Sequence, residues 1–194
     1  MSIFAKTITE ESYRKRLNAK QIAFSAMAVA LAMVTSMIKM FELPMGGSIT
    51  AFSMLFIVLI GYWFGLGTGL TAAVAYGVLQ LIVNPYVLNV PQVIVDYFLA
   101  FGALGLSGVF HEKKNGLVKG YILAVLGRYF FATLSGVIFF GTYAPDSFPN
   151  PLAYSLVYNG SYLGAEALIT LVLICIPPVQ HGLDIVKKTV AADE

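Results

Sequence analysis

Three ionisable side chains lie inside long apolar stretches of this sequence: Asp96, Arg128 and Glu166. A charge at membrane depth is costly and rare, so by default it marks a functional site. Asn159, Tyr162 and Glu166 follow an i, i+3, i+7 spacing, which places them on one face of a helix. Arg128 could form a structural ion pair with either carboxylate. Alternatively, Arg128 and the carboxylates could all bind a ligand. The sequence leaves both interpretations open.

The stretch 84–97, NPYVLNVPQVIVDY, interrupts the apolar sequence and ends just after Asp96. Its prolines stop a helix, because proline lacks the N–H and clashes with the preceding turn. Its asparagines and its glutamine offer partners for the backbone groups that the break releases. The aromatic residues expected near Asp96 are Tyr86, Tyr97, Phe140, Tyr143 and Tyr154. A carboxylate among aromatic rings suits a flat, cationic or amine-bearing ligand, so we predict that Asp96 faces a ligand cavity.

The composition identifies the class of protein that must position these side chains. The chain is 58% hydrophobic and 11% charged, with a mean hydropathy of +0.80, whereas a soluble domain carries about 25% charged residues. Several runs reach the roughly 18 apolar residues that indicate a bilayer-spanning helix. We therefore predict an all-α integral membrane protein, a compact bundle of six transmembrane helices forming a single membrane domain over 1–194.

The predicted spans cover about 21–38, 49–64, 70–83, 92–110, 118–141 and 152–176. The first apolar run is longer than the 7–15 residues of a signal-peptide core, so we interpret it as a span. Lysine and arginine concentrate in the N-terminal segment 1–20, in the turn around 111–119 and in the tail 177–194. Because short cytoplasmic segments carry the excess of these residues, both termini are predicted to be cytoplasmic. The proline-bearing segments 39–48, 84–91 and 142–151 are then loops on the outer face.

Small residues recur at every fourth position of the first span, at Ala28, Ala32 and Ser36. That spacing puts them on one helical face and permits close helix approach in lipid. Two interpretations are open for this face: internal packing, or docking of another subunit.

Several kinds of chemistry have no motif in the sequence. There is no GxxxxGK(S/T) phosphate loop, no HExxH, and no serine or cysteine matched with a histidine inside a span. The single cysteine, Cys175, excludes a disulfide framework and a cysteine metal site. We therefore expect no enzyme activity, no cofactor, no metal and no nucleic-acid partner.

Three ordered motifs carry a family resemblance: PYVLNVPQVIVDY at 85–97, GRYFFATLSGVIFFGTYAP at 127–145 and AYSLVYNGSYLGAE at 153–166. With these motifs the chain resembles the substrate-capture (S) subunits of energy-coupling-factor (ECF) vitamin transporters, most closely the thiamin-specific branch. The resemblance covers nearly the whole chain. It implies a multi-pass protein of the bacterial cell membrane whose partners are the lipid bilayer, a transmembrane coupling subunit and two ATPase subunits.

The resemblance also implies a set of site residues. Asp96 stands at the family's acidic position for the aminopyrimidine, and Arg128 at a basic pocket position. Phe140 stands where some relatives place a stacking tryptophan, while Ala132 replaces a histidine of close relatives and so lacks one polar contact. The predicted substrate-binding set is Asp96, Tyr86, Tyr97, Arg128, Phe140, Tyr154, Asn159 and Glu166.

We therefore predict a thiamin-binding subunit, with the ligand held between the spans at 92–110, 118–141 and 152–176. The segments 39–48 and 142–151 would act as lids, and the small-residue face of the first span would dock the coupling subunit. Three alternatives stay open: an S subunit for another pyrimidine or pyridine vitamin, a stand-alone carrier with Asp96 or Glu166 as proton relay, and a purely structural membrane subunit.

Overall fold

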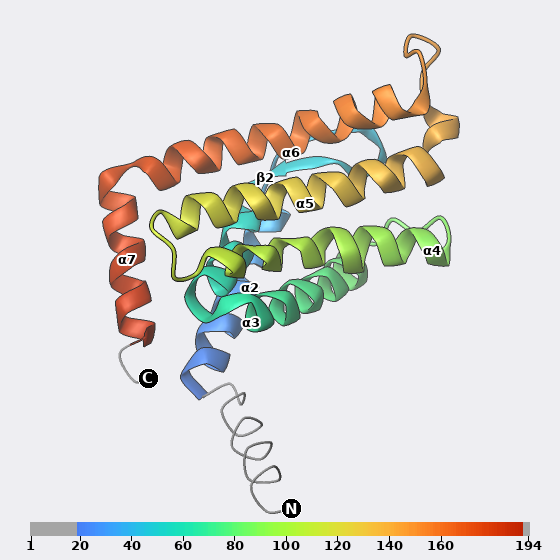
Figure 1. The fold of residues 1–194 in the computed structure, drawn as a ribbon. Helices are drawn as coiled ribbons and strands as arrows, with labels where there is room; N and C mark the ends of the chain where they lie inside the picture. Colours follow the sequence, from blue (N-terminus) through green and yellow to red (C-terminus); the bar gives the residue numbers. More distant parts are fainter. Residues whose placement is uncertain (1–18, 192–194) are drawn as a thin grey trace, which may run out of the picture.

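The computed structural model describes residues 19–191 (Figure 1). Its elements, in chain order, are α2 (Ala19–Met37), β1 (Lys39–Glu42), the 3₁₀ turn η1 (Pro44–Gly46), β2 (Ser48–Thr50), α3 (Ser53–Val83), α4 (Val90–Val93), the π-helix η2 (Ile94–Ala100), the 3₁₀-helix η3 (Ala103–Phe110), α5 (Gly116–Phe139), the 3₁₀ turn η4 (Gly141–Tyr143), α6 (Pro151–Cys175) and α7 (Pro177–Ala191). Residues 1–18 of the predicted cytoplasmic N-terminal segment and residues 192–194 of the predicted tail lie outside the described residues.

The long helices run side by side, and α7 crosses one end of the bundle (Figure 1). We call this the α7 end; the opposite end, where the β1–β2 hairpin and α4 lie, is the cavity end. Within 19–191, five helices are long and apolar enough to cross a membrane: Ala19–Met37, Ser53–Val83, Val90–Phe110, Gly116–Phe139 and Pro151–Cys175. The all-α membrane bundle is therefore confirmed.

Helix α3 contains the span predicted at 70–83 and most of the one predicted at 49–64, whose first residues belong to β2, because the chain reverses direction inside α3. Gly65 has φ +83° and ψ −178°, a conformation that a side chain would strain. A Cβ built on Gly69 would lie 2.7 Å from the Cα of Gly61. In a straight helix, residues eight apart are separated by about 12 Å. The two halves of α3 therefore lie against each other, and six apolar segments run along the bundle.

The small-residue face of α2 points into the bundle. Ala28 is 4% and Ala32 0% exposed, and Ser36 accepts a hydrogen bond from Gln80 Nε2 at 2.8 Å. The prediction that these three residues dock another subunit is therefore wrong, and they pack internally. The opposite face of α2 exposes long apolar side chains, as expected for a helix against lipid.

Two segments have more structure than the sequence suggested. Segment 39–48, predicted as a loop, forms most of an antiparallel hairpin in which Glu42 pairs with Ser48. The tail predicted at 177–194 contains α7, which begins at a proline, the residue that suits the first helical position. The hairpin was not predicted because short strands with turn-forming residues carry a weak periodic signal.

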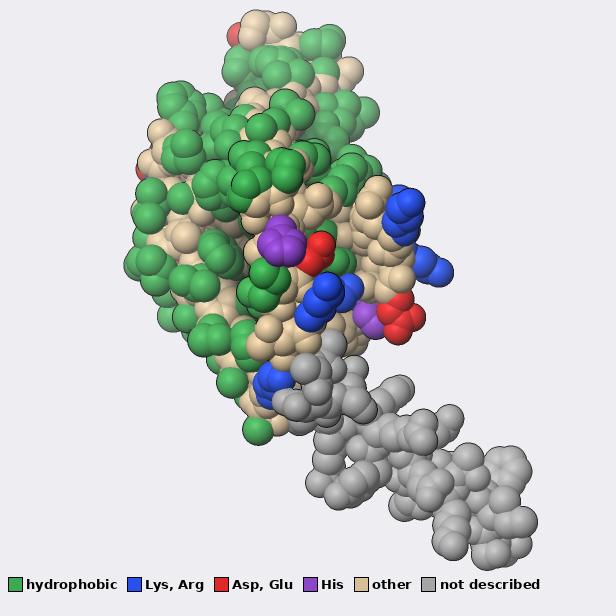
Figure 2. Space-filling view, turned by 90° about the vertical axis from the view of Figure 1, so that its left-hand side faces the viewer, with side chains coloured by type: hydrophobic (Ala, Val, Ile, Leu, Met, Phe, Trp, Pro, Cys, Tyr) green, Lys and Arg blue, Asp and Glu red, His purple; other side chains and the backbone are tan. Residues whose placement is uncertain are grey.

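Contacts between charged and aromatic side chains hold α7 across the bundle. Lys187 Nζ lies 3.8 Å from the centre of the Tyr62 ring and donates a hydrogen bond to the carbonyl of His111. Burial lowers the pKa of Lys187, while Asp184 and Glu112 act in the opposite direction. Figure 2 faces this end: charged and histidine side chains gather over it, and hydrophobic side chains cover the flanks. This distribution agrees with the predicted cytoplasmic side.

Candidate ligand-binding site

A cavity of about 770 Å³ opens at the cavity end of the bundle. Its walls come from the β1–β2 hairpin, α3, η2, α5 and α6. All eight residues of the predicted substrate-binding set line it: Asp96, Tyr86, Tyr97, Arg128, Phe140, Tyr154, Asn159 and Glu166. The structure thus brings together side chains that lie up to 80 positions apart in the sequence, 86 to 166.

The proline-bearing break forms one wall of the cavity through its own side chains. Asn89 Oδ1 accepts a hydrogen bond from the Gln92 N–H at 2.9 Å and so caps α4. Gln92 Nε2 donates to the Tyr86 carbonyl at 3.1 Å, and Gln92 Oε1 accepts from the Leu88 N–H at 3.1 Å. The backbone groups released by the break therefore find side-chain partners, as the sequence predicted.

Asp96 lies half-buried in η2, directly beside Tyr97. Its Oδ2 accepts a hydrogen bond from Gln92 Nε2 at 2.5 Å. Among residues 19–191, the ion pairs within 4 Å are Lys39 with Glu42 and His111 with Glu112. Asp96 therefore has no cationic side chain within ion-pair distance in the described part of the chain.

Arg128 makes a contact that the sequence did not predict. Its Cζ lies 4.2 Å from the centre of the Phe101 ring, a cation–π arrangement. It forms no ion pair with Asp96 or with Glu166, so the structural ion-pair interpretation is wrong within the described residues. The Phe101 ring thus supports the guanidinium at the cavity wall.

Glu166 lines the cavity but already has protein partners. Its Oε2 accepts hydrogen bonds from the Thr50 N–H and the Thr50 hydroxyl, both at 2.8 Å. Its Oε1 accepts from the Met54 N–H at 3.4 Å. The buried carboxylate thus joins α6 to the end of β2 and to the first turn of α3. This geometry fits an anchor for the hairpin better than a contact for a ligand.

Aromatic rings line two sides of the cavity. Tyr86 and Phe140 have ring centroids 5.7 Å apart, and Tyr97 stacks on Phe101 at 6.0 Å. The Tyr97 hydroxyl accepts from the Tyr86 N–H at 2.7 Å and donates to the carbonyl of Asn84 at 3.3 Å. These hydrogen bonds and the stacking on Phe101 fix the ring at the cavity wall.

Asn159 and Tyr162 share one face of α6, as their spacing predicted. The Tyr162 hydroxyl donates to Asn159 Oδ1 at 2.9 Å. Asn159 Nδ2 donates to the carbonyls of Ser155 and Ala132 at 2.9 and 3.3 Å. The amide is therefore held in one orientation between α5 and α6.

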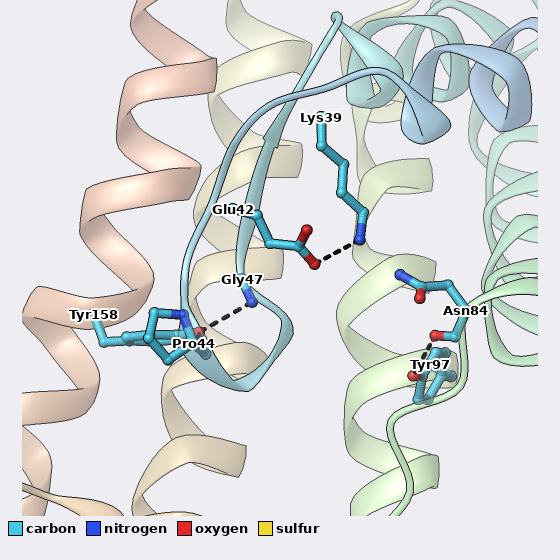
Figure 3. Close-up of polar contacts among 7 residues, drawn as sticks. All are labelled: Lys39, Glu42, Pro44, Gly47, Asn84, Tyr97 and Tyr158. Atoms are coloured by element: carbon cyan, nitrogen blue, oxygen red, sulfur yellow. Dashed lines mark hydrogen bonds and ion pairs between the residues drawn. The ribbon is translucent and has the colours of Figure 1, made fainter.

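The β1–β2 hairpin covers the cavity and is tied to α6 (Figure 3). The Tyr158 hydroxyl donates to the Pro44 carbonyl and accepts from the Gly47 N–H at 3.0 Å. Lys39 pairs with Glu42 at 2.7 Å within the hairpin. None of the described residues at 142–151 lines the cavity, so of the two predicted lids only 39–48 borders it.

Sequence reasoning missed several residues that shape the cavity. Gln92 and Tyr158 lie four positions from Asp96 and Tyr154, a helical spacing that could have identified both. Segment 39–48 was predicted as a lid, but its individual lining residues, such as Glu42, carried no such signal because they lie outside any periodic segment. Phe101 was also missed, since its role depends on a contact with α5.

The fold and the cavity define a class of protein: a membrane-embedded helical bundle with an aromatic-walled site for a small molecule. A sequence model of the thiamine transporter protein family matches residues 22–184. The chain is 32% identical to the thiamine transporter ThiT of Bacillus subtilis over 166 residues, 78% of this chain and 84% of that protein. It is also 32% identical to ThiT of Lacticaseibacillus paracasei over 127 residues, 57% and 63% of the two chains.

A solved structure supports the same relationship. ThiT from Listeria monocytogenes matches with a TM-score of 0.69 and 25% identity, over 81% of this chain and 94% of that chain. The present chain belongs to the thiamine transporter protein family. The predicted family, the multi-pass location in the bacterial cell membrane and the assignment as a transport protein rather than an enzyme are thereby confirmed.

Proposed function

We propose that this chain binds thiamin in the cavity and acts as the substrate-capture subunit of an ECF-type vitamin transporter. The observation that carries the proposal is the Asp96 carboxylate, which borders an aromatic-walled cavity and has no cationic side chain within ion-pair distance among residues 19–191. A buried charge of this kind is stabilised when a ligand of opposite charge occupies the site.

The chemistry of thiamin suits these walls. Thiamin carries an aminopyrimidine, a thiazolium cation and a hydroxyethyl arm, so it is flat, amine-bearing and positively charged. Asp96 can accept a hydrogen bond from the amino group, and a charge-assisted bond of this type is stronger than a neutral one. The rings of Tyr86 and Phe140 offer apolar, electron-rich faces for the cationic ring.

Partner subunits supply the energy in this proposal. The sequence contains no GxxxxGK(S/T) phosphate loop. The resemblance to S subunits implies a transmembrane coupling subunit and two ATPase subunits. Thiamin would enter at the cavity end beneath the hairpin and leave after the partners change the conformation of the bundle.

Calorimetry on the purified protein tests the ligand assignment. We expect saturable thiamin binding that Asp96→Asn weakens by about 10- to 100-fold, because a hydrogen bond to a charged group is lost. The matched control is Asp146→Asn, an exposed carboxylate outside the cavity lining, which should bind like the wild type. An absence of binding, or equal affinities for Asp96→Asn and the wild type, contradicts the proposal.

Uptake assays test the partnership. Vesicles that contain this chain alone should show no thiamin accumulation, whereas vesicles that also contain the coupling and ATPase subunits should accumulate thiamin with ATP. Accumulation by the chain alone under a pH gradient would instead support the proton-coupled carrier.

A further inference from the structure

The helix that carries Asp96 is wider than an α-helix at this residue. Residues Ile94–Ala100 form the π-helix η2, in which hydrogen bonds join residues five apart. Here both Asp96 and Tyr97 line the cavity. The π-helical segment therefore forms part of the cavity wall.

A single glycine of the neighbouring helix makes room for this turn. Gly77 is buried in α3, and a Cβ built on it would overlap the carbonyl oxygen of Tyr97. The same Cβ would lie 3.1 Å from the Tyr97 carbonyl carbon and 3.0 Å from the Phe101 Cβ. The first of these neighbours is backbone, which cannot move aside by changing a rotamer. Any side chain at position 77 must therefore displace η2.

A displacement of η2 would move the residues around Asp96 and also those that support Arg128. Asp96 is hydrogen-bonded to Gln92, and the Tyr97 hydroxyl accepts from the Tyr86 N–H. Phe101 supports Arg128 by the cation–π contact described above. The position of the η2 backbone against Gly77 therefore affects Asp96 and Tyr97 directly, and Arg128 through Phe101.

We propose that Gly77 is a positioning residue for ligand recognition. Because it has no side chain, the π-helix η2 can pack directly against α3, and this packing places the Asp96 carboxylate at the cavity wall. Gly77 touches no ligand and acts through Asp96. This inference rests on the proposed function, since it takes thiamin as the ligand that Asp96 recognises.

The first test compares thiamin affinities by calorimetry. Gly77→Ala should bind thiamin at least about tenfold more weakly than the wild type, the loss expected when a charge-assisted hydrogen bond is misaligned. Gly164→Ala in α6 is the matched control, because a Cβ there meets nothing within 4 Å. Wild-type affinity in Gly77→Ala overturns the inference.

A double-mutant cycle separates positioning from a merely structural effect. If Gly77 acts through Asp96, Gly77→Ala should cost little further affinity once Asp96→Asn is present, because residues that act as a unit are non-additive. Additive losses of affinity would show that Gly77 does not act through Asp96 and would overturn the inference. Thermal unfolding of each variant, measured alongside, reports on stability separately.

A second variant decides the question if Gly77→Ala cannot be purified in folded form. Deletion of Val95 removes one residue from the π-turn and lets the segment close into an α-helix. The inference expects this deletion to weaken thiamin binding as much as Asp96→Asn does; retained wild-type affinity would overturn it. The proposed function fails separately, if the wild-type protein does not bind thiamin at all.

Discussion

The two ends of the bundle are built from different contacts. At the α7 end, α3 and η3 meet backbone to backbone: a Cβ on Gly105 would overlap the backbone of Leu70, and one on Gly108 would overlap that of Gly65. At the cavity end, apart from the backbone contact of Gly77 with η2, tyrosine, glutamine and carboxylate side chains separate the helices and hydrogen-bond across the space between them. Close glycine contacts give strong packing in lipid, because backbones approach without a side chain between them.

This difference suggests a division of roles. Each side-chain hydrogen bond contributes only about 1 kcal/mol, so the hairpin and the break can rearrange around a ligand. A backbone-to-backbone contact has no comparable alternative arrangement, since protein interiors are already close-packed. The α7 end then serves as the rigid part of the molecule, and the cavity end as the adaptable part. Four substitutions test this contrast.

The largest expected effect comes from filling a backbone contact at the α7 end. Gly105→Ala should lower the free energy of unfolding by about 3 kcal/mol or more, because the added methyl overlaps the Leu70 backbone. Thermal unfolding in detergent measures the loss, and Gly182→Ala, whose Cβ meets nothing within 4 Å, is the control. Equal melting temperatures would show that the α7 end is not rigid.

The second effect concerns the buried anchor of the hairpin. Glu166→Gln should destabilise the protein by about 1.5–3 kcal/mol, because the carboxylate accepts bonds from Thr50 and Met54 that an amide only partly replaces. Hydrogen exchange should show the hairpin opening before the rest of the bundle. Glu112→Gln, at the exposed turn of the α7 end, should leave exchange unchanged. Uniform loss of protection would contradict a local role for Glu166.

A third, smaller effect should appear in the kinetics of release. Tyr158→Phe removes the hydrogen bonds to Pro44 and Gly47, about 1 kcal/mol, and should speed thiamin release roughly fivefold. Dissociation of radiolabelled thiamin measures the rate, with the half-exposed Tyr143→Phe as control. Release at the wild-type rate would mean that the hairpin does not restrain the ligand.

The smallest effect is expected at α7. Lys187→Met removes the cation–π contact with Tyr62 and should cost about 0.5–1 kcal/mol of stability. Thiamin affinity should stay unchanged, because α7 lies at the end remote from the cavity. Thermal unfolding and calorimetry on one preparation give both values. A weakened affinity would reveal coupling between the two ends.

Much of this architecture could be predicted from the sequence, because long apolar runs and isolated charges are local signals. Asp96, Arg128 and several aromatic residues, Phe140 among them, were singled out by residue type and position, and the family motifs then added binding roles for Arg128 and Phe140. The spacing of Leu183, Val186 and Val190 is also typical of a helix and agrees with α7.

The remaining features depend on contacts between distant segments. The π-turn at Asp96 requires Gly77, about twenty positions earlier, and no local pattern reports that contact. Arg128 and Glu166 were expected as a possible ion pair. Instead, Arg128 packs over the Phe101 ring, and Glu166 accepts a hydrogen bond from the Thr50 N–H. Pairing in a folded bundle is decided by which groups tertiary packing brings within reach.

The most direct test of the central claim is a structure of this protein with thiamin bound. The account predicts that the aminopyrimidine lies in the cavity with its amino group about 3 Å from the Asp96 carboxylate, the distance of a hydrogen bond. Thiamin bound with its aminopyrimidine away from Asp96, or outside the cavity, would contradict it.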